Sequence, residues 1–378
     1  MSLPSQSKLR SFYKLLKTLP DFRDRRGLRH DQAFVLMSVT LALFHGYTTV
    51  HSIHAFCLDS LAWLRKLTRY SAGQAVSRSY LPEFLAGVGL AQLRQLMTDF
   101  FKSWWPPSGW LAGDGKVFRG STGDGQKVGA VFLVAHGTKL ELLQKEQLSH
   151  KDHELPVMRQ LLADSGLDSA RLSFDALYLA PELLRQVHAR GGSYLVQLKG
   201  NQEVLLTHCA RLSVQESALV QQRGEDKQHG RHVQRTARLF PLRADALDER
   251  WAPCGLTYVL QVLKVTTKKG VQTSDVFYYV TNLKDKRSLR ELLDELDTAA
   301  RQHWSVESNN WSRDTLMRED LVLVKNGPQA LVLAVLRSIA LNALRLVRPA
   351  GLSLPLFTER LARNPKLSEE RLRHLGFI

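Results

Sequence analysis

The hydrophobic pattern of the chain changes near Trp110, and this change restricts the possible folds more than any other feature. The residues before it show helical periodicity, whereas short β-type runs separated by glycine turns come after it. The predicted strands cover Trp110–Asp114, Gly129–Ala135 and Leu140–Gln147, and two later ones end at Asp175 and Lys199; helices are predicted between them at Glu154–Asp164 and Pro181–Ala189. Strands that alternate with helices in this way predict an α/β fold with a mixed sheet.

The helical rhythm lapses again between residues 207 and 285, where a β-rich insertion is expected. Strands are predicted at His232–Leu239, Thr257–Thr267 and Asp275–Leu283. A turn of two lysines and Gly270 would join the last two as a hairpin. Helical periodicity returns from Ser288, which is a suitable N-cap residue, and continues to the end of the chain.

The excess of positive charge indicates a polyanionic partner. The chain has 52 Lys and Arg residues against 36 Asp and Glu, a formal net charge of +16. Such an excess favours nucleic acid. A membrane surface is the competing partner, but binding there would require an exposed basic amphipathic helix, and no clear one is found.

The first 106 residues contain a pattern typical of small DNA-binding units. A helix is predicted at Asp31–Phe44, and after Gly46 either Thr48 or Thr49 can cap a second helix that runs to about Cys57. The basic loop before them contains Arg23, Arg25, Arg26 and Arg29. Two helices joined by a glycine turn suggest a helix-turn-helix-like unit, although a plain helical bundle with a solvated basic loop fits the pattern as well. A further helix is predicted over Leu81–Phe101.

Cysteine content and apolar runs favour a cytoplasmic protein. Cys57, Cys209 and Cys254 lie far apart and form no CxxC pair, which argues against disulfides and thiolate-bound zinc. The first residues do not resemble a signal peptide. The apolar run Ala33–Phe44 is short, and Arg337 and Asn342 interrupt the run Ala330–Leu346, so both are expected to form buried helices.

Three acidic residues are candidates for metal-dependent chemistry. Asp114 and Asp175 are each expected at the end of a strand, where side chains of an open sheet reach the ligand-binding crevice, and Glu307 is expected in a helix. Three converging carboxylates would suit Mg²⁺ or Mn²⁺, and two such ions can promote displacement at phosphorus. From spacing alone, each of the three could equally be a cap, a turn residue or a surface ion-pair partner.

Ordered motifs along most of the chain carry a family resemblance. They read LPDFRDRRGLRH, LAGDGKVFRGS, FDALYLAPELLRQVHARGGSYLVQLKGNQ, HGR, YYVTNL, HWSVE and VLRSIALNALR. In these the chain resembles the bacterial insertion-sequence DDE transposases of the ISAs type, which include the H-repeat-associated proteins. The resemblance implies a ribonuclease H-like core with the triad Asp114, Asp175 and Glu307, two Mg²⁺ (or Mn²⁺) ions, and cleavage and strand transfer at inverted-repeat DNA ends by a homo-oligomer.

The resemblance also implies a division of the chain into domains. A helical DNA-binding domain would cover residues 1–106, and the catalytic core would begin with residues 107–206. The β-rich insertion would occupy 207–285, helices of 286–348 carrying Glu307 would complete the core, and 349–378 would form a helical tail.

The chain departs from the family pattern after Glu307. The stretch Ser308–Trp311 is one residue shorter than expected, and on a helix one lost residue rotates all subsequent side chains by about 100°. The roles of Trp311, Arg313 and Asp314 are therefore open. His153 stands where a small polar residue is expected.

Further polar residues near the motifs are predicted to contact DNA. They are Lys116 and Arg119 after the first aspartate, Lys199, Asn201 and Gln202 after a strand, His229 and Arg231 in the insertion, and His303 before Glu307. The alternatives are surface charges for the first pair and a helix-initiating turn for residues 199–202. Trp304 is expected in the core.

An active transposase is the leading functional hypothesis. Two others stay open, namely a domesticated transposase that binds DNA without cutting it and a nuclease that cuts without transposing.

Overall fold

The computed structural model describes residues 11–24, 26, 28–105, 109–123, 125–148, 154–228, 230–243, 247–284 and 288–378. Arg25, His153 and His229, which the sequence singled out, lie outside these ranges. The chain divides into two compact units. The first unit is Met1–Pro107, Gly115–Glu154 and Glu307–Ile378, and the second is Ser108–Asp114 and Leu155–Val306.

The strands have the hydrogen-bonding order β3-β2-β1-β4-β5-β9-β8-β7-β6. Their bounds are β1 Trp110–Gly123, β2 Gln126–Ala135, β3 Glu141–Leu148, β4 Arg171–Phe174, β5 Ser193–Leu198, β6 Val220–Gln228, β7 Arg231–Pro241, β8 Tyr258–Lys268 and β9 Val271–Thr281. β4 is parallel to both β1 and β5, whereas β2 and β3 are antiparallel to each other. The order 3-2-1-4-5 with this mixture of directions is that of a ribonuclease H-like core, so the predicted fold class is confirmed.

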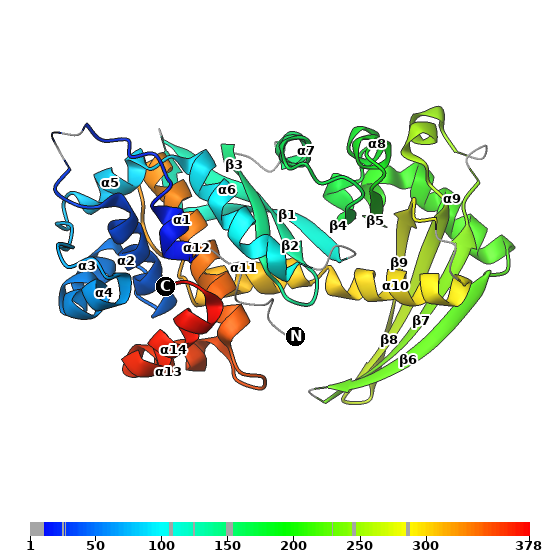
Figure 1. Cartoon of the computed structure of the whole chain (residues 1–378). Coiled ribbons are helices and arrows are strands. Elements are labelled where there is room, and N and C mark those ends of the chain that lie inside the picture. The colour runs from blue at the N-terminus through cyan, green and yellow to red at the C-terminus, as the bar shows by residue number, and fades with distance from the viewer. Residues whose placement is uncertain are drawn as a thin grey trace. The chain divides into compact units, whose positions relative to one another are not determined.

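The second unit contains the first residues of β1 and strands β4 to β9. Its helices are α7 Glu154–Asp164, which begins at the unit boundary, α8 Pro181–Ala189, α9 Glu203–Gln215 and α10 Leu289–Gln302, with 3-10 turns η5 Ala176–Tyr178, η6 Gly200–Gln202 and η8 Glu249–Cys254. Leucines and alanines of α10, among them Leu293 and Leu296, pack on Leu239 and Leu260 of the sheet. The helix itself runs across the strands (Figure 1). Burial of this apolar stripe fixes α10 on the sheet.

The antiparallel strands of the second unit form two successive hairpins. β8 and β9 pair along their whole length, up to Lys268↔Val271 beside the turn, which confirms the predicted hairpin. β7 pairs with β8 and also with β6, a strand that the sequence pattern did not predict. The segment Val220–Gln228 is almost entirely polar, so it lacks the alternation that marks a half-buried strand.

The first unit combines helices from both ends of the chain with β2, β3 and the rest of β1. The N-terminal helices are α1 Phe12–Leu16, α2 Gln32–Phe44, α3 Val50–Asp59, α4 Leu61–Thr68, α5 Leu81–Gly87 and α6 Leu90–Phe101, with η3 Lys102–Trp104 after them; the C-terminal helices are α11 Ser305–Thr315, α12 Gly327–Val347, α13 Leu354–Arg363 and α14 Pro365–Leu375. α12 packs against α2, α5 and α6 (Figure 1). The two ends of the chain therefore share one core.

The predicted helix pair near the N-terminus is present. α2 is buried along its whole length, as expected, and Thr49 caps α3 through a capping box with Ser52. His45 at the end of α2 hydrogen-bonds through Nε2 to Ser368 Oγ of α14 at 2.8 Å. This buried contact joins the N-terminal helix pair to the last helix of the chain.

Two expectations about helices need correction. The helix predicted over Leu81–Phe101 is two helices, because Val88 has extended backbone dihedrals and α6 begins anew after Gly89. The run that forms α12 was expected to be too polar to cross a membrane, but α12 is long and apolar enough by length and composition. Its expected burial is confirmed, since 89% of its apolar window is buried within the structure.

Candidate functional site

Two of the three candidate carboxylates come from adjacent parallel strands of the second unit. The paired register of β1 and β4 runs from Trp110↔Arg171 to Gly113↔Phe174. Asp114 and Asp175 are the next residues on each strand, and both side chains are partly buried. Because neighbouring strands lie about 4.8 Å apart, this register places the two aspartates side by side.

The position of Asp114 differs in one respect from the prediction. It was expected at the end of its strand, but β1 continues to Gly123. The pairing with β4 ends at Gly113 instead, and β4 itself ends before Asp175. The strands therefore part after Gly113 and Phe174, at the positions of the two carboxylates.

Glu295 of α10 holds the beginnings of the same two strands. Its Oε1 accepts hydrogen bonds from Trp110 Nε1 at 2.7 Å and from Arg171 Nη1 at 2.6 Å. Trp110 and Arg171 are the first residue pair of the β1–β4 register. One carboxylate thus ties both strands to α10, which stabilises the register that aligns Asp114 with Asp175.

The backbone after Asp175 forms a short turn that is held by side chains. Asp175 Oδ1 accepts from the Leu177 amide at 2.9 Å and caps η5. Asn201 Nδ2 donates to the Ala176 carbonyl at 2.6 Å, and Gln202 Nε2 donates to the Leu179 carbonyl at 3.1 Å. These two amides support the turn that carries Asp175, and their direct contact with DNA stays a prediction.

His303 adjoins Asp175 in the second unit. Its Nδ1 lies 3.0 Å from Ser173 Oγ on β4. Burial lowers the pKa of His303 to about 4, while the charge of Asp175 acts in the opposite direction and that of Lys199 acts with burial. The imidazole of His303 is therefore neutral near pH 7. It can form hydrogen bonds beside Asp175 but adds no positive charge there.

Trp304, which was expected in the core, is 60% exposed. It stands in the turn between the end of α10 at Gln302 and the start of α11 at Ser305. Hydrophobic composition alone does not predict burial there, because the turn separates the residue from the buried stripes of both helices.

Glu307, the third candidate, lies in the first turn of α11 and is exposed. It belongs to the first unit. The opposite face of α11 carries Asn309 and Arg313, both fully buried. Since residues three, four and seven apart share a helix face, Glu307 shares its face with Trp311 and Asp314 instead.

A buried polar network fixes the inner face of α11. Glu141 of β3 accepts from Asn309 Nδ2 at 2.6 Å and from Arg313 Nη1 at 2.8 Å, and it also accepts from Ser338 Oγ of α12. Arg313 forms two further hydrogen bonds of 2.7 Å to the carboxylate of Glu319. Burial alone would lower the pKa of Arg313, but Glu141 and Glu319 raise it above its usual value. The guanidinium therefore stays charged in the core.

Sequence reasoning missed this network, although one signal was present. Arg337, Ser338 and Asn342 are polar residues within the apolar run of α12, and all three are buried. Arg337 Nη1 lies 3.5 Å from Glu319 Oε1. The side chain of Asn342 accepts a hydrogen bond from the Glu141 amide and donates one to the Glu141 carbonyl. A polar residue inside a buried apolar helix requires buried partners. The polar residues within the apolar run of α12 thus indicated that a buried polar network exists, but they did not show which residues of other elements belong to it.

The remaining predicted DNA contacts differ in exposure. Arg26, Arg29 and Arg231 are exposed. Arg23 instead pairs with Asp21 at 2.6 Å and donates to the His30 carbonyl, with its side chain only 6% exposed. Lys116 is 8% exposed and paired with two carboxylates, whereas the side chain of Arg119 is 85% exposed.

The donor set of the second unit suits a hard divalent cation. Asp114 and Asp175 provide carboxylate oxygens from adjacent strand positions, which are the ligands that Mg²⁺ and Mn²⁺ prefer. Over the described ranges, no three His, Cys, Asp or Glu side chains are grouped so that they could hold one ion.

Comparison with known protein families accounts for most of the chain. Residues 118–343 match the model of the transposase DDE domain, and residues 13–101 match the model of the segment associated with that domain. The chain belongs to the DDE transposase family. The domain match includes Asp175 and Glu307 and begins four residues after Asp114.

Relatives in the family cover the chain almost from end to end. It is 22% identical to "Putative transposase YncI" of Escherichia coli O157:H7 over an alignment of 353 residues that covers 89% of this chain and 88% of the relative. It is 21% identical to "H repeat-associated putative transposase YhhI" of Escherichia coli (strain K12) over an alignment of 355 residues that covers 89% of this chain and 91% of the relative. The resemblance to the H-repeat type is thereby confirmed.

A solved structure of a piggyBac transposase synaptic complex with hairpin DNA is also similar. The TM-score is 0.47 at 10% identity, with 96% of this chain and 80% of that chain covered.

Proposed function

We propose that this DDE transposase is catalytically active and cuts and joins DNA at transposon ends in the cytoplasm by metal-dependent phosphoryl transfer. The observation that carries the proposal is the register of β1 and β4, which sets Asp114 beside Asp175 at the point where the strands part. Family membership supplies the reaction class, because the chain matches the transposase DDE domain over residues 118–343.

In this proposal Asp114, Asp175 and Glu307 hold two Mg²⁺ ions, for which Mn²⁺ can substitute. When bound, such ions activate the attacking hydroxyl and stabilise the leaving oxygen of an in-line displacement. Asp175 is kept in place by its turn, which Asn201 and Gln202 support. Glu307 is presented by α11, whose inner face is locked by Glu141.

The proposed DNA partner is the inverted-repeat end of the element and its target, bound by a homo-oligomer. The exposed cations Arg26, Arg29, Arg119 and Arg231 are candidates for phosphate contacts, since such contacts position a protein on DNA. The N-terminal helices of residues 1–106 would bind the ends, and the insertion of residues 207–285 would add contacts through its hairpins.

The Asp114→Asn variant tests the catalytic part of the proposal. It removes one negative charge but little volume, so metal-dependent cleavage of a duplex carrying the element end should be lost while binding of that duplex stays within about twofold. The assay compares Mg²⁺ with EDTA and separates nicked, hairpin and joined products. Asp168→Asn is the matched control, since Asp168 lies in the same unit with its side chain 73% exposed.

The same assay distinguishes the alternatives. Binding without any cleavage by the parent protein would indicate a domesticated DNA-binding protein. Nicks without joined products would indicate a nuclease. Cleavage that persists in Asp114→Asn at the parent rate would refute the assignment of that carboxylate.

A further inference from the structure

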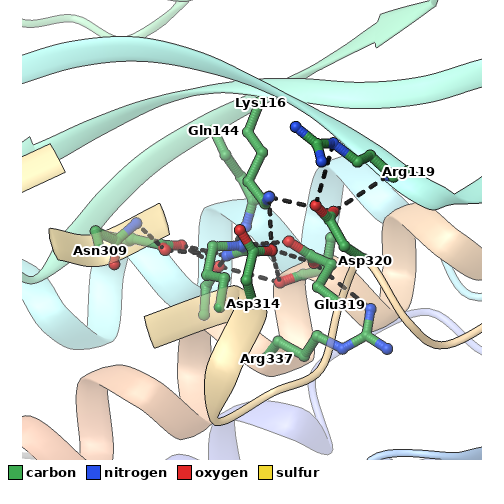
Figure 2. Close-up of polar contacts among 12 residues, drawn as sticks. Lys116, Arg119, Gln144, Asn309, Asp314, Glu319, Asp320 and Arg337 are labelled. Carbon is green, nitrogen blue, oxygen red and sulfur yellow. Dashed lines mark hydrogen bonds and ion pairs between the residues drawn. The ribbon is translucent and has the colours of Figure 1, made fainter. Parts of the chain in front are cut away.

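Lys116 occupies a position that its motif does not explain. It stands two residues after Asp114 on β1, where a lysine beside a catalytic aspartate would ordinarily be assigned to DNA phosphate. The structure instead buries its side chain to 8% exposure and places its Nζ 2.7 Å from Asp314 Oδ1 and 3.2 Å from Asp320 Oδ1 (Figure 2). Two carboxylates already compensate the single charge of the ammonium group.

Both partners of Lys116 come from α11 and the segment directly after it. Asp314 lies seven residues, or two helical turns, after Glu307 and therefore on the same face of α11. Lys116 and Asp114 lie on the same side of β1, because side chains of a strand alternate. The ion pair thus joins the face of α11 that carries Glu307 to β1 at Lys116.

The backbone reinforces the same connection. The Arg119 amide donates to Asp320 Oδ1 at 3.2 Å, the Thr122 amide donates to the Val324 carbonyl at 2.9 Å, and the Val324 amide donates to the Gly120 carbonyl at 2.9 Å. A Cβ atom on Gly120 would lie 2.5 Å from the Val322 carbonyl oxygen, so this close approach requires glycine. The segment after α11 is therefore held along β1 at several points.

We propose that Lys116 is a positioning residue, which anchors α11 to β1 and so sets the orientation of Glu307, and that it does not contact DNA phosphate. The expected effect of Lys116 on DNA cleavage rests on the proposed function, whereas the anchoring of α11 to β1 does not. A buried ion pair is weak evidence for added stability, and the role that we assign to this one is to hold geometry. Loss of the pair should then slow the chemical step without weakening the DNA complex.

The test compares Lys116→Met, Asp314→Asn and the double variant. Methionine keeps most of the apolar stem of lysine and removes the charge. We expect each single variant to lower the single-turnover cleavage rate by about 10- to 100-fold, the range typical of residues that orient metal ligands. The double variant should be no slower than the slower single variant, because both changes remove the same interaction. Lys116→Arg keeps a cation that can pair with both aspartates, so this variant should retain most of the parent's cleavage rate.

Affinity for the end duplex, measured over a range of salt concentrations, provides the second readout. The slope of log affinity against log salt should be the same in Lys116→Met and the parent. If Lys116 contacted a DNA phosphate, the Lys116→Met substitution would instead weaken binding to all sequences and reduce the magnitude of the slope by about 0.9. That result would overturn the proposal. Arg119→Met is the positive control on the same strand, because Arg119 is an exposed cation and a candidate phosphate contact, so its loss should reduce the magnitude of the slope by about 0.9.

The two readouts also separate this inference from the proposed function. If the parent protein binds DNA but does not cleave it, the catalytic proposal fails. Two measurements then still test the role of Lys116. An unchanged salt slope in Lys116→Met, and effects of Lys116→Met and Asp314→Asn on urea unfolding that are less than additive, would support the ion pair. Additive effects on unfolding and on cleavage would contradict the ion-pair role.

Discussion

Replacing Arg313 by methionine is expected to lower the free energy of unfolding by about 3–5 kcal/mol, the range found when one partner of a buried ion pair is removed. The variant would leave Glu141 and Glu319, both fully buried, without their principal cation. Arg337 would compensate Glu319 in part from 3.5 Å. Urea denaturation monitored by circular dichroism measures the change.

Two further variants make this expectation specific. Arg318→Met removes an exposed arginine five residues later and should change the free energy of unfolding by less than about 0.5 kcal/mol. Combining Arg313→Met with Glu141→Leu should recover part of the loss, because a buried charge then disappears together with its partner. A single Arg313→Met variant as stable as the parent would show that the network does not hold α11.

Replacing Asp175 by asparagine should reduce metal-dependent cleavage by about 10³-fold with little effect on stability. The ions supply several kcal/mol of transition-state stabilisation, and each 1.36 kcal/mol corresponds to a factor of ten. Asparagine caps a helical turn about as well as aspartate, so the bond from the Leu177 amide should survive. Single-turnover cleavage and thermal unfolding of the same preparation test the two parts together.

Asp175→Ala is the informative companion, since it removes both functions. It should be as inactive as Asp175→Asn and in addition less stable by about 1 kcal/mol, the usual value of an N-cap. If Asp175→Asn kept the parent activity, Asp175 would be a capping residue alone. If both variants unfolded at lower temperature by the same amount, the cap would not be the source of the loss.

The local pattern of the sequence predicted those elements whose stability depends on nearby residues. Thr49 is a capping residue that precedes helix-forming sequence, and α3 begins there. The turn at Gly270 joins two strands of matching length, and β8 and β9 form that hairpin. The strands that carry Asp114 and Asp175 were also predicted, because apolar runs precede both aspartates.

Elements that depend on distant partners were not predictable in the same way. β6 is a strand because β7 pairs with it, not because its own polar residues favour one. Arg313 is buried because Glu141, 172 residues away in the chain, meets it in the core. The shortened stretch after Glu307 left the orientation of α11 open, and the contacts of Asn309 and Arg313 with Glu141 define which face is inside.

The central claim is that the carboxylates of Asp114, Asp175 and Glu307 bind the same divalent ions. Crystals of the transposase with end DNA, grown in Mn²⁺, would test it through the anomalous signal of the metal. We predict anomalous peaks within about 2.2 Å of oxygen atoms from all three side chains. Peaks bound by other residues, or a Glu307 carboxylate that takes no part in metal binding, would contradict the claim.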